Sequence, residues 1–191
     1  MGWQHRPPDP TVVIYDSEQR IVVASNLQSG QEMAKSCFLS FHYKPDCWRV
    51  SQIKKIGAID GQELLDSNDW ESIKKKGDAG IQKWIADNMN GKDCLIVLVG
   101  EKTAGRRWVN YEIKKAWRDG LGVLAIHIHN LKNSDGEQAK KGTDPFIGLT
   151  VDGEAITGRI YDPPYKISTN VYYHIKENIS DWIDDAIRAR G

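Results

Sequence analysis

From about residue 35 onward, short apolar runs alternate with longer segments in which apolar residues recur every three or four positions. The runs are too short for helices and predict buried strands over 36–41, 58–59, 94–99, 123–128 and 159–161. The longer segments predict amphipathic helices over 48–56, 70–89, 108–119 and 170–187. This alternation predicts an α/β fold of the flavodoxin-like kind, with a central parallel sheet of about five strands in the order 2-1-3-4-5. Helices are expected on both faces of the sheet.

The two ends of this pattern are less regular. Residues 1–32 begin with a proline-rich stretch and contain two short apolar patches, 12–15 and 21–24, separated by turn residues that favour a hairpin. We predict that residues 1–32 are an appendage outside the fold and that the domain comprises 33–191. Within it, residues 130–158 are rich in turn residues and predict a long loop region.

Composition narrows the classes of partner and compartment. Lysine plus arginine equals aspartate plus glutamate, 26 each, so the net charge is zero and bulk attraction to nucleic acid or to an anionic membrane is not expected. No apolar run approaches the roughly 18 residues of a membrane span, and residues 1–8 lack the apolar core of a signal peptide. Cys37, Cys47 and Cys94 follow no CxxC spacing and are expected to be reduced thiols. We therefore expect a cytoplasmic protein.

A tryptophan and a carboxylate, Trp108 and Glu112, lie one helical turn apart directly after the strand predicted at 94–99. In open α/β sheets, ligands bind where central strands end. A helical projection places Glu112 about 85° from the centre of the apolar face, at the margin between core and solvent, and Tyr111 on the more exposed side. The simplest alternative is a surface glutamate that pairs with Lys115.

Four segments together resemble TIR domains, and among these the TIR-like ThsB proteins of bacterial Thoeris anti-phage systems. They are residues 38–43, 66–72, 106–113, and 126–128 taken with 144–146. The third resembles the Trp-Cys-x-x-Glu box of TIR domains, with Val109 at the cysteine position. The resemblance covers about residues 33–149. It departs from the family at residues 60–63, where the Asp-x-x-Pro-Gly loop of many TIR domains is replaced by a sequence without proline.

The resemblance implies NAD⁺ chemistry, with release of nicotinamide and formation of free or cyclised ADP-ribose. Carried over, Glu112 is the catalytic residue, and NAD⁺ is the substrate rather than a cofactor. ThsB proteins use such a nucleotide as a signal that activates an effector protein, ThsA, after phage infection. The implied partners are therefore NAD⁺, ThsA reached through the nucleotide, and a phage component as the trigger. A homo-oligomer is left open.

The residue type suits this reaction independently of the resemblance. Nicotinamide in NAD⁺ is a cationic leaving group that needs no general acid, and one carboxylate can stabilise the oxocarbenium-like transition state. A metal is not required. Because the substrate has two flat rings, aromatic side chains are expected around it; the substrate-binding candidates are Phe41, His42, Trp70, Trp108 and Tyr111. The nucleophile that captures the ribose, whether water or an atom of the nucleotide, is left open.

Other chemistries are less well supported by the sequence. Arg106 and Arg107 could reach a pyrophosphate, although arginines near a helix start are commonly solvated. His127 and His129 alternate on a strand and could bind a metal, but no third ligand is evident nearby and we expect them to pack. A GxGxxG fingerprint is missing, which argues against hydride transfer. The main rival to an enzyme is a TIR interaction module, a scaffold without NAD⁺ turnover.

Overall fold

The computed structural model describes residues 34–61 and 67–190, together with two short strands, β1 (Val13–Tyr15) and β2 (Ile21–Val23). The chain divides into two compact units, residues 1–33 and 34–191. In the first unit β1 and β2 pair antiparallel, which is the pairing that the turn residues between them predict. The other residues of this unit lie outside the described part of the chain, so the assignment of 1–32 as an appendage stays a prediction.

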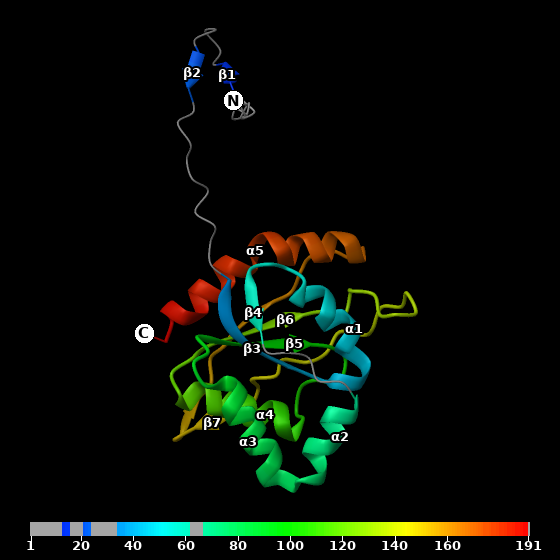
Figure 1. The fold of residues 1–191 in the computed structure, drawn as a ribbon, viewed down its shortest axis with the longest axis vertical. Coiled ribbons are helices and arrows are strands. Elements are labelled where there is room, and N and C mark those ends of the chain that lie inside the picture. Colours follow the sequence, from blue (N-terminus) through cyan, green and yellow to red (C-terminus); the bar gives the residue numbers. More distant parts are fainter. Residues whose placement is uncertain (1–12, 16–20, 24–33, 62–66, 191) are drawn as a thin grey trace, which may run out of the picture. The chain divides into compact units, whose positions relative to one another are not determined.

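The second unit is built on a five-stranded sheet in which all neighbours are parallel (Figure 1). Its strands are β3 (Lys35–Phe41), β4 (Ile59–Gly61), β5 (Cys94–Val99), β6 (Gly122–His127) and β9 (Arg159–Tyr161). Their spatial order, β4-β3-β5-β6-β9, is the predicted 2-1-3-4-5 order. Every residue of β5 and β6 is buried, which explains why these strands read as unbroken apolar runs.

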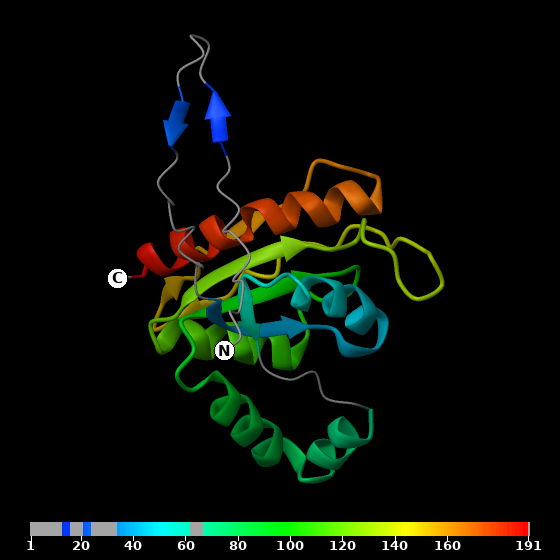
Figure 2. The ribbon, with the colours of Figure 1, turned by 45° about the horizontal axis from the view of Figure 1, so that its top comes forward.

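Helices cover both faces of the sheet, as expected (Figure 2). Helices α1 (Tyr43–Lys54) and α5 (Ser168–Arg188) pack on one face, where they meet strand residues such as Leu39 and Ile96. Helices α3 (Gly77–Met89) and α4 (Arg107–Arg118) pack on the other face, against Phe38 and Val97 among others. Successive strand residues therefore pack on opposite faces of the sheet, and this alternation decides which side chains of β3 can reach α4.

The single helix predicted over 70–89 is two helices, α2 (Ser67–Lys75) and α3. The break falls at Gly77, whose φ of +70° is a left-handed conformation that favours glycine. No described atom lies within 4 Å of a Cβ built at Gly77, so this glycine serves the turn and not close packing on the sheet. At Gly80 a Cβ would lie 2.3 Å from the Cβ of Lys76, so the absence of a side chain on Gly80 leaves room for the Lys76 side chain in the preceding turn.

Two other helices begin earlier than predicted. Helix α1 starts at Tyr43 rather than at residue 48. Pro45 is compatible with this earlier start, because it lies in the first turn, where a missing amide hydrogen costs no helical hydrogen bond. Helix α5 starts at Ser168, two residues before the start predicted at residue 170. None of the helices in the described residues is both long and apolar enough to cross a membrane.

The predicted loop region 130–158 contains one small element, an antiparallel pair formed by β7 (Thr150–Val151) and β8 (Glu154–Ala155). The start of the loop is fastened to α1 by Arg49, which donates hydrogen bonds to the carbonyl oxygens of Leu131 at 2.8 Å and Glu137 at 3.0 Å. A buried guanidinium thus binds two loop carbonyls, one of which, that of Glu137, also accepts from the Asn133 amide at 2.8 Å.

Candidate active site

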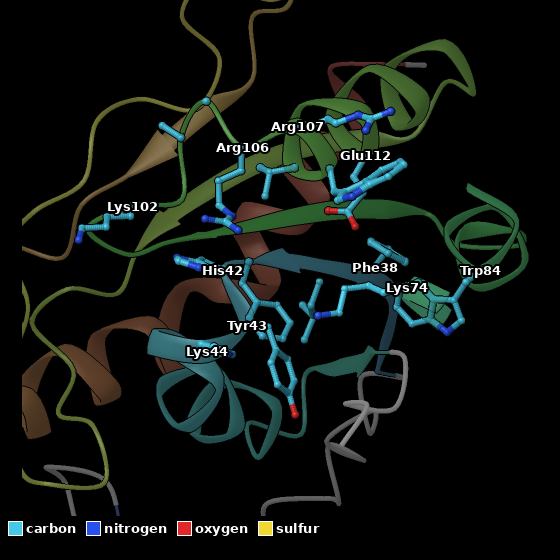
Figure 3. A pocket seen from close by; sticks show the side chains of 16 residues that line it. Phe38, His42, Tyr43, Lys44, Lys74, Trp84, Lys102, Arg106, Arg107 and Glu112 are labelled. Atoms are coloured by element: carbon cyan, nitrogen blue, oxygen red, sulfur yellow. The ribbon is translucent and has the colours of Figure 1, made fainter. Parts of the chain in front are cut away.

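A cavity of about 910 Å³ opens where β3 and β5 end, on the side of the sheet covered by α4 (Figure 3). Its walls come from the end of β3, the start of α1, the loop between β5 and α4, and the first turns of α4, with single contributions from α2 and α3. The volume falls within the range of about 300–1,000 Å³ that is typical of small-molecule sites. The position is the edge of the sheet where ligands of this fold class bind.

Glu112 carries the one carboxyl group among the described residues that line this cavity. It lies on the flank of α4, whose buried positions include Val109 and Ile113, and the side chain points into the hollow (Figure 3). Ser40 of β3 donates a hydrogen bond from its Oγ to Glu112 Oε2 at 2.5 Å. Ser40 is 1% exposed, so the hydroxyl is held rigidly by the sheet. The predicted placement of Glu112 at the border between core and cleft agrees with this geometry.

Burial raises the pKa of Glu112 to about 8, and the hydrogen bond from Ser40 opposes part of that rise. In the ligand-free protein the carboxyl is therefore largely protonated at neutral pH. A positive charge placed beside it would stabilise the carboxylate and lower its pKa again. The site thus favours ionisation of Glu112 when a cationic group enters the cavity.

Five basic residues also line the cavity: Lys44, Lys74, Lys102, Arg106 and Arg107. Two of them are already engaged. Lys74 pairs with Glu71 at 2.5 Å, and Arg107 pairs with Asp78 while its guanidinium lies over the Trp108 ring, 4.8 Å from the centroid. The other three have no ion-pair partner among the described residues, which leaves their charge available to an anionic ligand.

His42 marks the polar end of the cavity. Figure 3 shows the Arg106 side chain extending toward it. Burial, and then the positive charges of Arg106 and Lys102, lower the pKa of His42 below its usual value. Its Nδ1 atom is buried and has no hydrogen-bond partner in the described part of the chain. A neutral imidazole with an unsatisfied nitrogen is suited to hydrogen bonding with a ligand rather than to acid catalysis.

Three of the predicted substrate-binding residues, Phe41, His42 and Trp108, line the cavity. Tyr111 does not; its ring packs edge-on against that of Trp108, with centroids 5.8 Å apart. Trp70 belongs to α2, but its side chain lies outside the described residues. The role of these residues in binding stays a prediction.

Ser40 and Lys102 were not singled out from the sequence. Ser40 had a usable signal, because it is the one polar residue in the otherwise apolar run 37–41. Such a residue needs a hydrogen-bond partner, and alternation places it on the α4 side together with Phe38. Lys102 had no such signal in the sequence, because a lysine in a loop is usually solvated.

A second group of polar side chains gathers at the same edge of the sheet, where β6 and β9 end. His127 and His129 were expected to pack together for want of a third ligand, and their rings do contact each other edge-on, with centroids 5.7 Å apart. The structure also brings Asp162, which directly follows β9, to the same place. One potential ligand atom from each of the three residues lies within 4.8 Å of the others.

Comparison with known proteins agrees with this architecture. Residues 38–133, which make up half of the chain and include Ser40 and Glu112, match the family described as "Thoeris protein ThsB, TIR-like domain". A curated relative from Bacillus cereus (strain MSX-D12), named "Putative cyclic ADP-D-ribose synthase ThsB1", is 34% identical over 119 residues. The match covers 60% of this chain and 62% of that relative, so it spans less than two thirds of either protein. The fold, the strand order and the extent of the family match together show that the chain belongs to the ThsB family of TIR-like domains.

Proposed function

We propose that this protein cleaves NAD⁺, releasing nicotinamide and producing a cyclic signalling nucleotide derived from ADP-ribose. The observation that carries the proposal is the Glu112 carboxyl, held by Ser40 in a cavity whose other charged side chains are all basic. The relative named as a cyclic ADP-D-ribose synthase supports the same reaction class.

In this reaction the bond between ribose C1′ and the nicotinamide nitrogen breaks, and its electron pair leaves with nicotinamide, which becomes neutral. The positive charge moves to the ribose, where an oxocarbenium-like centre forms at C1′. The Glu112 carboxylate stabilises that centre because it lies in a partly water-excluded wall, where a fixed charge acts more strongly than in water. A nucleophile then bonds to C1′; if it belongs to the same nucleotide, the product is cyclic.

The protonation of Glu112 fits a substrate of this charge. The nicotinamide ring of NAD⁺ is cationic, and its arrival beside Glu112 stabilises the ionised carboxylate that the empty cavity disfavours. Substrate binding and activation of the carboxylate are therefore coupled. A neutral dinucleotide ring, such as reduced nicotinamide, would gain no such stabilisation.

The remaining walls suit the other parts of a dinucleotide. Arg106 and Lys102 offer positive charge to the pyrophosphate. Trp108 and Phe41 offer aromatic surface to the planar rings.

We extend the proposal to anti-phage signalling, because the family is that of the Thoeris protein ThsB. On this proposal a phage component triggers synthesis, and the nucleotide activates an effector of the ThsA kind. The alternative remains a non-catalytic TIR scaffold, in which Glu112 and the tryptophans are fold residues.

The direct test is to incubate the full chain with NAD⁺, with and without lysate of phage-infected cells, and to measure free nicotinamide. We expect release from the wild type, its loss in Glu112→Gln, and unchanged release in the control Glu177→Gln, an exposed glutamate of α5. Mass spectrometry of the nucleotide product distinguishes a cyclic from a linear form. No release by the wild type under either condition would favour the scaffold, and equal release by Glu112→Gln would reject the site.

A further inference from the structure

We propose that His127, His129 and Asp162 form a binding site for a divalent transition metal ion of the Zn²⁺ class, separate from the Glu112 cavity. Two imidazoles and one carboxylate are a donor set that suits zinc, with one coordination position left for water. None of the three residues lines the cavity that contains Glu112.

The topology brings these residues together from two parallel strands. His127 ends β6, His129 follows it by two residues, and Asp162 directly follows β9, the neighbour of β6 in the sheet. The potential ligand atoms lie within 4.8 Å of one another. Ligands at about 2.0–2.2 Å from zinc in a tetrahedron stand about 3.3–3.6 Å apart, so the three side chains must close by about 1 Å. Asp162 can do so, because its side chain is 42% exposed.

The unsatisfied nitrogens at this position are potential donor atoms for a metal ion. The Nδ1 atoms of both His127 and His129 are buried and have no hydrogen-bond partner among the described residues. His127 is 5% exposed. A buried polar atom without a partner destabilises the fold, and a metal ion bound through Nδ1 would supply the partner that each ring lacks. Simple packing of the two histidines leaves both nitrogens unexplained.

A lysine competes for the carboxylate of this site. The Nζ of Lys141 lies 2.7 Å from Asp162 Oδ2, and both side chains are partly exposed. The positive charge of this ammonium group beside the carboxylate opposes a metal cation there, which lowers the affinity of the site. The loop region 130–158 contacts this site in two ways. It contains Lys141, and its Ala139 amide donates a hydrogen bond to the His129 carbonyl oxygen at 2.9 Å. Metal binding therefore joins the ends of β6 and β9 and weakens the ion pair between Lys141 and Asp162.

The first experiment titrates the full chain with ZnCl₂ by calorimetry and measures retained zinc by mass spectrometry after desalting. We expect one zinc ion per chain in the wild type, and affinity at least about tenfold weaker in His129→Ala and in Asp162→Asn. The matched control is His174→Ala, a histidine of α5 that contacts Tyr165 and Trp182, and it should bind as the wild type does. These variants avoid the nearly fully buried His127. Absence of binding by the wild type, or wild-type affinity in both ligand variants, would overturn the proposal.

A second experiment tests the competition by lysine. Removing the ammonium group in Lys141→Met should tighten zinc binding about two- to fivefold, since an exposed ion pair contributes up to about 1 kcal/mol. The adjacent exposed Lys140→Met is the control and should leave the affinity unchanged. Equal affinities in the two lysine variants would remove Asp162 from the proposed ligand set.

Discussion

Two regions at the same edge of the sheet hold buried polar groups in different surroundings. Where β3 and β5 end, an acid is buried among apolar and aromatic side chains, beside an open cavity lined by cations. Where β6 and β9 end, two imidazoles and a carboxylate meet under the loop that begins at residue 130. The first region has one carboxyl with a single hydrogen bond from Ser40. In the second, neither His127 Nδ1 nor His129 Nδ1 has a partner among the described residues, a state that His42 Nδ1 shares in the first region.

The difference shows which kind of ligand each region can accept. The Glu112 region offers one titratable anion and several cations, so it suits an organic ligand that carries both signs of charge. The His127 region offers neutral donors and one carboxylate at short range, so it suits a small cation. Parallel strands bring side chains to one edge without deciding their chemistry; the residues that follow each strand decide it.

The largest expected effect is a loss of nicotinamide release that leaves the His127 region unchanged. Glu112→Gln keeps the size of the side chain but cannot carry a negative charge, so nicotinamide release should fall at least about 100-fold. Zinc binding at His127 and His129 should not change in the same variant. Initial rates of nicotinamide release and a zinc titration measure the two effects, and a parallel loss of both would show that the regions are not independent.

The second prediction concerns stability and pH. The folded-state pKa of Glu112 is about 8 and its ordinary value is 4.5, so the folded protein keeps a proton that the unfolded chain releases between these values. Wild-type stability should therefore fall as pH rises from about 4.5 to about 8, and Glu112→Gln should not show this fall. The free energy of unfolding of the glutamine variant, relative to wild type, should rise by about 1–3 kcal/mol across this window.

Urea unfolding at pH 5 and pH 8.5 measures this difference. Glu177→Gln removes an exposed glutamate of α5 and should follow the wild type at both pH values. If the stability of Glu112→Gln changed with pH as the wild-type stability does, the pKa of Glu112 would not be raised by burial.

The third prediction concerns the cations of the cavity. Arg106→Ala removes an exposed guanidinium that has no ion-pair partner among the described residues. The KM for NAD⁺ should rise about fivefold at low salt, with a smaller change in kcat, because the pyrophosphate is bound equally in the ground and transition states. Steady-state kinetics at two ionic strengths measure it, and the difference should shrink at high salt. A fall in kcat alone would place Arg106 at the reacting atoms.

The smallest effect is expected at Ser40. Its hydrogen bond lowers the pKa of Glu112, so Ser40→Ala should raise that pKa further. The pH profile of kcat/KM, which reports the free enzyme, should rise with an inflection near 8 in the wild type and at higher pH in the variant. At pH 7 the variant should lose about two- to threefold in kcat/KM, and Ser40→Thr, which keeps the hydroxyl, should recover part of it. Identical profiles would assign Ser40 a packing role.

Much of the fold could be predicted because its signals are local. The run 94–99 defines β5 without error, and strand–helix alternation predicts the sheet order. The break between α2 and α3 was missed because apolar residues keep a helical period across it, while the conformation of Gly77 depends on the tertiary structure.

The site was only partly predictable for a similar reason. Glu112 and Trp108 lie on one helix, where spacing defines their relation. The hydrogen bond from Ser40 spans 72 residues, and the approach of Asp162 to His129 depends on β6 and β9 being neighbours. Contacts of this kind follow from topology rather than from spacing along the chain, and a sequence pattern alone does not contain them.

The basic residues around the cavity also bear on how fast a product leaves. Cleavage at the ribose does not alter the pyrophosphate, so contacts that Arg106 and Lys102 make to it in NAD⁺ persist in the nucleotide that is formed. Nicotinamide departs neutral, while the signal retains both phosphate charges. On the proposed function, the contacts that bind the substrate would therefore also slow the release of the nucleotide product.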